Sequence, residues 1–194
     1  MKRRAFLCTA GAVAAPSASA SSQGLTKSAS PPLLTITGAI AKTNRGPFDP
    51  ARDILMGKHG VKFDKAFSVD YPMLARLPST RFDVTLEYDR KRHELRGPLL
   101  TDVLALARSS TTDATVLHMR AVDGYAPHIS VAEARRHRYI VATLLDGEPL
   151  ALGGLGPLWA IYEADRFPEI AAKPVDQRFA TCPWAMYHID VGDG

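Results

Sequence analysis

The apolar stretches of this chain are short, rich in β-branched residues and separated by turns that contain glycine or proline. Stretches such as 115–122, 139–145 and 158–162 are too short for independent helices and are typical of strands. The sequence holds 14 Gly and 14 Pro, which supply the turns between them. Together with a few segments of helical spacing, this pattern predicts an α+β domain with mixed β-sheets and short helices.

The expected elements follow from local signals. We expect strands over 33–37, 63–67, 81–88, 115–122, 125–129, 139–145, 158–162 and 185–191. One short helix should begin after the cap residue Asp70 and end at Pro78. A second should open at Gly97-Pro98, and a third should run from Ser130 with Glu133 in the capping-box position.

The first twenty residues have the features of an export signal. Arg3 and Arg4 precede a mildly apolar stretch, 5–15, and Ala18-Ser19-Ala20 is a small-x-small cleavage pattern. This arrangement favours a twin-arginine-like signal over 1–20, with a general secretory signal as the alternative. A flexible leader over 21–32 and a single domain over 33–194 should follow, and the mature protein is expected in the periplasm.

Charge and hydropathy argue against nucleic-acid binding and against a membrane-spanning segment. The formal charge of +4 falls to +1 when residues 1–20 are removed, because 21 basic residues then face 20 acidic ones. The basic runs 90–93 and 135–138 are more typical of solvated surface than of a clustered nucleic-acid face. No segment after the signal approaches the roughly 20 apolar residues of a membrane span. We therefore expect neither nucleic-acid binding nor a membrane-spanning segment.

Cysteine and histidine usage argues against a metal centre. Cys8 lies in the signal, so Cys182 is the one cysteine of the mature sequence, and neither a disulfide nor a cysteine-based zinc site can form. We expect Cys182 to be buried and inert. The six histidines lack short metal-ligand spacing, although His118 and His128 flank an expected hairpin and could face each other.

Three ordered segments resemble a known family. They are Leu95-Arg-Gly-Pro-Leu-Leu-Thr-Asp102 followed by His118-Met-Arg-Ala-Val-Asp123-Gly-Tyr125, then Tyr139-Ile-Val-Ala-Thr-Leu-Leu-Asp146-Gly-Glu-Pro149, then Gly156-Pro-Leu-Trp159-Ala-Ile-Tyr162. In this order they resemble the molybdopterin domain of sulfite oxidases, especially its small bacterial periplasmic branch, over roughly 33–191. The resemblance implies a sulfite-oxidase molybdopterin-domain-like fold and a pterin pocket.

The resemblance does not imply oxidoreductase chemistry. In true members a loop cysteine upstream of the Gly-Pro-Leu segment binds molybdenum, whereas residues 33–181 contain no cysteine. The chain is similar to cysteine-less relatives that are periplasmic pterin-binding regulators of membrane proteins that make or degrade cyclic di-GMP. It departs from them at Glu163, where a proline is usual, and at Trp184-Ala185, where a tryptophan-glutamine pair is common.

Nine residues are candidates for contact with a pterin, which is a flat bicycle with an aminopyrimidine edge. They are Trp159 and Tyr125 for an aromatic wall, Asp123 and Asp146 for the donor edge, Gly153, Gly154 and Gly156 for close backbone approach, Arg138 for a polar group or phosphate, and Tyr162 as a further ligand contact. Each has a plainer explanation: Trp159 as core, the aspartates as hairpin turns, the glycines as a surface loop and Arg138 as a surface ion pair.

The expected function is therefore binding rather than catalysis. The sequence predicts a periplasmic regulatory protein that binds a pterin without molybdenum and signals to the periplasmic domain of a membrane-bound enzyme. The first alternative is a molybdopterin-dependent oxidoreductase or a subunit of one. The second is a degenerate scaffold whose pocket is closed by side chains such as Trp159.

Overall fold

A computed structural model describes residues 30–192 of the chain. The expected export signal, the expected leader up to residue 29 and the last two residues lie outside the described part. The expected leader is wrong at its end, because Pro32 already belongs to the first strand and pairs with Asp70. The described strands are β1 Pro32–Gly38, β2 Ala66–Asp70, β3 Ser79–Thr85, β4 Arg92–Pro98, β5 Val116–Ala121, β6 His128–Ser130, β7 Ile140–Ala142, β8 Leu144–Leu145, β9 Glu148–Pro149, β10 Trp159–Ile161 and β11 Met186–Gly192.

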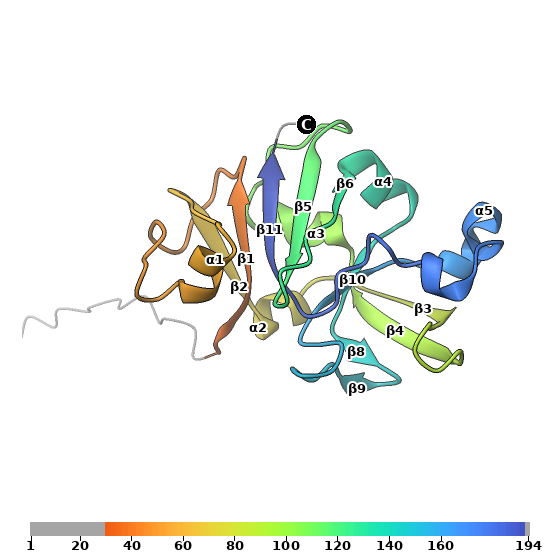
Figure 1. Ribbon diagram of the computed structural model, residues 1–194. Helices are drawn as coiled ribbons and strands as arrows, with labels where there is room; N and C mark the ends of the chain where they lie inside the picture. The colour runs from red at the N-terminus through yellow and green to blue at the C-terminus, as the bar shows by residue number, and fades with distance from the viewer. Residues whose placement is uncertain (1–29, 193–194) are drawn as a thin grey trace, which may run out of the picture.

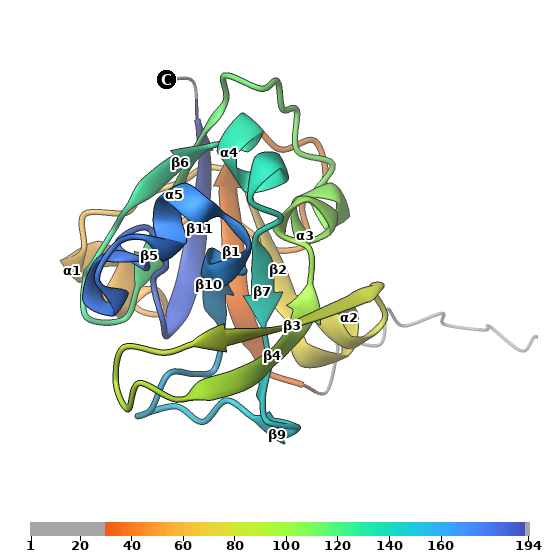
Figure 2. The same ribbon diagram turned by 90° about the vertical axis from the view of Figure 1, so that its right-hand side faces the viewer.

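The strands form three sheets (Figure 1). The large sheet has the order β2-β1-β11-β5-β6, with β1 and β11 parallel and the other pairs antiparallel. A four-stranded sheet has the order β3-β4-β8-β9, and β7 pairs with β10. The β3–β4 ribbon runs across the direction of β1 and β11 (Figure 2). The predicted α+β architecture with mixed sheets and short helices is confirmed.

The helices are short, as expected. They are α1 Ile54–Lys58, α2 Tyr71–Ala75, α3 Leu100–Leu106, α4 Val131–Arg136 and α5 Pro168–Ala171, with 3₁₀ turns η1 Ala164–Arg166 and η2 Val175–Gln177. Two predicted caps are confirmed. The side chain of Asp70 accepts a hydrogen bond from the backbone N–H of Met73, and Ser130 and Glu133 form a reciprocal capping box at α4.

Alternation along the large sheet separates two faces. On one face, apolar side chains such as Ile36, Met119 and Ile189 are fully buried in the main core, against which α3 packs. The other face is polar, and the segment 39–65 with α1 covers part of it through a small cluster around Met56 and Phe63. α1 and α3 thus lie on opposite sides of the large sheet (Figure 1).

Three expectations about element boundaries are wrong. Gly97-Pro98 ends strand β4 instead of opening a helix, and α3 begins at Leu100. The expected strand 63–67 is shifted, because pairing with β1 places β2 at Ala66–Asp70. The expected strand 139–145 is divided, because β7 pairs with β10 whereas β8 pairs with β4.

Among residues 30–192, no helix is long and apolar enough to cross a membrane.

Gly97 sits where β4 crosses β7. A Cβ on Gly97 would lie 2.0 Å from the backbone oxygen of Val141, which cannot move away without displacing the strand. We expect Gly97→Ala to lower the free energy of unfolding by about 3 kcal/mol, as measured by urea denaturation. Gly46→Ala is the matched control, since nothing lies within 4 Å of its Cβ position. Equal stability of the two variants would contradict this packing.

Candidate ligand-binding site

Residues 178–182, termed here the anchored segment, are held by side chains from three different parts of the chain. Trp159 is 1% exposed and donates from Nε1 to the carbonyl oxygen of Cys182 at 3.0 Å. The hydroxyl of Tyr162, a residue 5% exposed, donates to the carbonyl oxygen of Arg178 at 2.7 Å. Both aromatic side chains therefore lie beneath the segment as core residues, and neither offers an open ring face.

Two further tyrosines hold the middle of the anchored segment. The Tyr125 hydroxyl donates to the carbonyl oxygen of Ala180, and the hydroxyls of Tyr139 and Thr181 are 2.6 Å apart. Tyr139 is almost fully buried, whereas Tyr125 is 48% exposed. Four aromatic residues thus fix a segment without regular secondary structure, and Tyr125 is the one that also reaches the surface.

The thiol of Cys182 lies inside this arrangement. It is buried, and it interacts with the Tyr139 side chain and the Tyr162 backbone. Burial raises the pKa of this thiol well above its usual range, so at neutral pH it is protonated. The expectation that Cys182 is buried is confirmed.

Tyr88 is an exposed aromatic residue in the turn between β3 and β4, and it meets the chain at Trp184, two residues after the anchored segment. It is 54% exposed, and its hydroxyl interacts with Glu87 and Trp184. Partial burial and the neighbouring Glu87 carboxylate raise the pKa of Tyr88 to about 12.

Asp123 lies beside Tyr125 in the turn after β5. Its Oδ1 accepts the backbone N–H of Tyr125 at 2.9 Å, and its side chain is exposed. This is the local turn geometry that an Asp-Gly pair favours. The same turn also brings a carboxylate next to an exposed aromatic ring.

The glycine loop is attached to the residues that follow the anchored segment. The backbone N–H of Ala185 donates to the carbonyl oxygen of Leu155 at 2.9 Å, between Gly154 and Gly156. A Cβ on Gly156 would lie 2.2 Å from the backbone oxygen of Leu150. The protein's own backbone therefore fills the space that Gly156 leaves, while Gly154 is exposed.

Arg138 follows α4 and lies on the outer side of Tyr162. With Glu163 and Arg166 it lines a small pocket of about 110 Å³. The neighbouring residue His137 stacks on the Tyr162 ring, with ring centroids 5.1 Å apart. Arg138 thus borders the aromatic cluster from outside.

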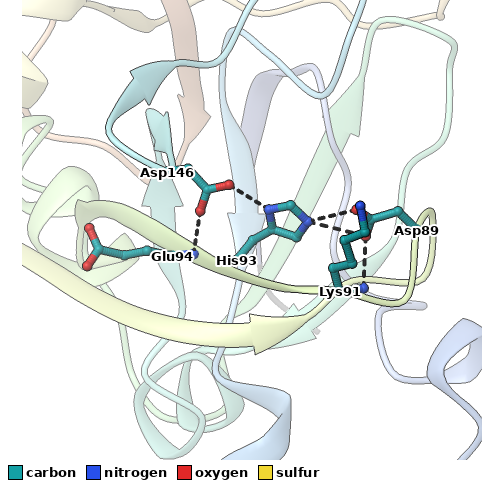
Figure 3. A network of polar contacts seen from close by, with 5 residues as sticks. All are labelled: Asp89, Lys91, His93, Glu94 and Asp146. Carbon is teal, nitrogen blue, oxygen red and sulfur yellow. Dashed lines mark hydrogen bonds and ion pairs between the residues drawn. The ribbon is translucent and has the colours of Figure 1, made fainter.

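Asp146 lies in a different place, at the turn between β8 and β9 (Figure 3). Its Oδ2 is 2.6 Å from Nδ1 of His93, and its Oδ1 accepts the backbone N–H of Glu94 at 2.9 Å. Asp89 contacts the other ring nitrogen of His93 at 3.0 Å. The hydrogen bond that the Asp146 carboxylate accepts from His93 is the largest cause that raises the pKa of His93, and the hydrogen bond to Asp89 is the next. Asp146 therefore joins the β8–β9 hairpin to β4.

The structure brings together most of the predicted site residues, but in roles that differ from those expected. Tyr125, Trp159 and Tyr162 converge on the anchored segment, whereas the Asp146 side chain binds His93 and the Glu94 backbone instead. Sequence reasoning missed Tyr88, Tyr139, Thr181 and Trp184. Their aromatic character was the one signal that could have suggested a role for Tyr88 and Tyr139. The sequence around residues 88 and 139 does not indicate that either residue lies near residue 182.

The described residues hold no group of three or more His, Cys, Asp or Glu side chains that could bind a metal ion. His118 and His128 do face each other, with ring centroids 5.6 Å apart.

We expect Tyr162→Phe to lower the free energy of unfolding by about 1 kcal/mol, because it leaves the Arg178 carbonyl without its buried donor. Tyr71→Phe is the control, since Tyr71 is 41% exposed on α2. Urea denaturation of both variants measures the difference. An unchanged midpoint for Tyr162→Phe would show that the hydroxyl does not hold the segment.

The pKa of His93 predicts a pH-dependent contribution to stability. The pKa of His93 is raised above its usual 6.5 in the folded protein, so protonated His93 stabilises the fold fully below about pH 6.5. This contribution is lost as the pH rises through the folded-state pKa. The pKa values of Asp89 and Asp146 are lowered, so the same interaction weakens again in acid. His93→Gln should therefore destabilise most between about pH 4 and pH 6.5. A stability difference that grows above pH 8 would contradict this network.

The comparisons with known proteins identify the fold. No known family model matches the chain, and no curated protein matches its sequence. Among solved structures, the sulfane dehydrogenase SoxCD from Paracoccus pantotrophus is similar, with a TM-score of 0.54 and 13% sequence identity. The similarity covers 83% of this chain and 38% of that chain, so this chain spans well under half of its length. The domain has a sulfite-oxidase-like fold.

Proposed function

We propose that this protein is an exported, non-catalytic regulatory protein that binds a pterin beside the anchored segment. The proposal rests on two exposed aromatic residues, Tyr125 and Tyr88, which contact the chain at Ala180 and at Trp184, in and just after a segment that buried aromatic residues hold in place. Each ring has a carboxylate next to it, Glu87 in one case and Asp123 in the other. Aromatic surface and carboxylates on a fixed frame are what a flat ligand with N–H donors requires.

The residues present suit a pterin in a modified arrangement. Tyr88 and Tyr125 would offer ring faces, and Glu87 or Asp123 would accept hydrogen bonds from the aminopyrimidine edge. Trp159 and Tyr162 would act from below, by holding the backbone of the segment. Because that backbone is already ordered, little conformational entropy would be lost on binding.

The position of Cys182 supports binding without molybdenum. Its thiol is buried and enclosed by the Tyr139 side chain and the Tyr162 backbone, so it is not presented to a ligand beside the anchored segment. The rival function is a molybdopterin-dependent oxidoreductase or a subunit of one. The similarity to a sulfane dehydrogenase favours that rival, but at 13% identity the likeness extends to the fold alone.

Regulation requires a surface whose conformation depends on the ligand. Tyr88 lies in the β3–β4 turn, and His93 links the base of that turn to the β8–β9 hairpin. A pterin with unequal affinity for two positions of this turn would shift its population. The partner, on the resemblance in sequence, is the periplasmic domain of a membrane-bound enzyme of cyclic di-GMP metabolism.

Fluorescence titration with tetrahydrobiopterin under reducing conditions tests the proposed site. Tyr88→Ala and Asp123→Asn should each weaken binding several-fold to about tenfold, because each removes one recognition element. Tyr71→Ala removes an exposed tyrosine on α2 that is not part of the proposed site, and it should bind like the wild type. Unchanged affinity in both site variants would place any pterin elsewhere.

A further inference from the structure

The polar face of the large sheet carries a cleft on the side opposite the main core. It has a volume of about 320 Å³ and lies between the loop 60–62 and side chains of β5 and β11. Its lining residues are Gly60, Val61, Lys62, His118, Arg120, His188 and Asp190. Strand register explains the cluster, because His188 pairs with Arg120 and Asp190 pairs with His118 on the two neighbouring strands.

Arg120 is incompletely satisfied in this cleft. Its Nη1 makes one long hydrogen bond, of 3.4 Å, to the carbonyl oxygen of Gly124. Its Nε is buried without a hydrogen-bond partner, and it is the only such side-chain atom among residues 30–192. A buried guanidinium donor without a partner is costly, and carboxylate or phosphate oxygens match its geometry. Lys62 adds a second positive charge at the rim.

The hydrogen-bond chain at the floor of the cleft fixes the state of His188. Thr37 Oγ1 is 2.5 Å from Asp190 Oδ1 and 2.9 Å from His188 Nε2. A carboxylate can only accept, so the single hydroxyl hydrogen of Thr37 goes to Asp190 and the Thr37 oxygen accepts from His188 Nε2–H. Burial lowers the pKa of His188 to about 4, so the ring is neutral at pH 7. The floor therefore adds no positive charge.

From these contacts we propose a second binding site, for a small molecule that carries an oxyanion group, either a phosphate or a carboxylate. Arg120 and Lys62 bind the anionic group, and they outnumber the single negative charge of Asp190, which the Thr37 hydroxyl already engages. The site lies on the face of the sheet opposite the main core. Arg120 also donates to the Gly124 carbonyl oxygen, between Asp123 and Tyr125, but the proposal for the cleft stands whether or not a pterin binds there.

Calorimetric titration of the full chain with inorganic phosphate at low ionic strength tests this site. We expect saturable binding at one phosphate per chain, weakened about tenfold or more in Arg120→Gln. Asp190→Asn keeps the acceptor for Thr37 but removes a negative charge, so it should tighten binding a few-fold. Arg76→Gln, which removes an exposed arginine at the end of α2, should have no effect.

Two further arms complete the test. If Arg120→Gln does not fold, Lys62→Gln at the exposed rim should still weaken phosphate binding several-fold. A parallel titration with acetate distinguishes the two oxyanion classes, since the tighter of the two probes identifies the group that the cleft prefers. The proposal is overturned if neither anion binds saturably, or if Arg76→Gln weakens binding as much as Arg120→Gln.

Discussion

β11 is the last described strand in the chain, yet it lies in the middle of the large sheet, parallel to β1 and antiparallel to β5. Its register with β1 is tight, because a Cβ on Gly38 would lie 2.1 Å from the backbone oxygen of Val191. One side of β11 supplies Ile189 to the core, and the other supplies His188 to the polar cleft. The anchored segment leads directly into this strand, so the position of β11 determines both candidate sites.

The two candidate sites differ in whether their buried polar groups have hydrogen-bond partners. Around the anchored segment, burial is compensated: each aromatic hydroxyl or indole N–H has a partner, and the enclosed Cys182 thiol stays protonated. In the cleft, the Nε of Arg120 is buried without a hydrogen-bond partner, so the protein itself does not satisfy every donor of this guanidinium group. The first arrangement gives rigidity beneath an exposed aromatic surface, and the second gives selectivity for charge.

Local signals predicted the elements that depend on local interactions. The capping box of Ser130 and Glu133 involves residues three apart, and it was predicted correctly for that reason. Strand β4 was missed because charged residues alternate along its wet face, and its pairing with β3 and β8 comes from elsewhere in the chain. For Trp159 the sequence left open an aromatic wall or a place in the core, and its burial confirms the core; its indole N–H donates to a carbonyl oxygen 23 residues away in sequence, which no local pattern indicates. Tyr88 was not predicted as a site residue because its contact with Trp184 also joins residues far apart in sequence.

Whether a pterin binds beside the anchored segment without molybdenum can be tested on protein that is exported to the periplasm of its native host and purified without added cofactor. Mass spectrometry and fluorescence would identify the small molecule that co-purifies, and molybdenum would be quantified on the same sample. We expect a pterin in near-stoichiometric amount and no molybdenum. Molybdenum at one atom per chain would contradict this expectation and would assign the protein to the oxidoreductases.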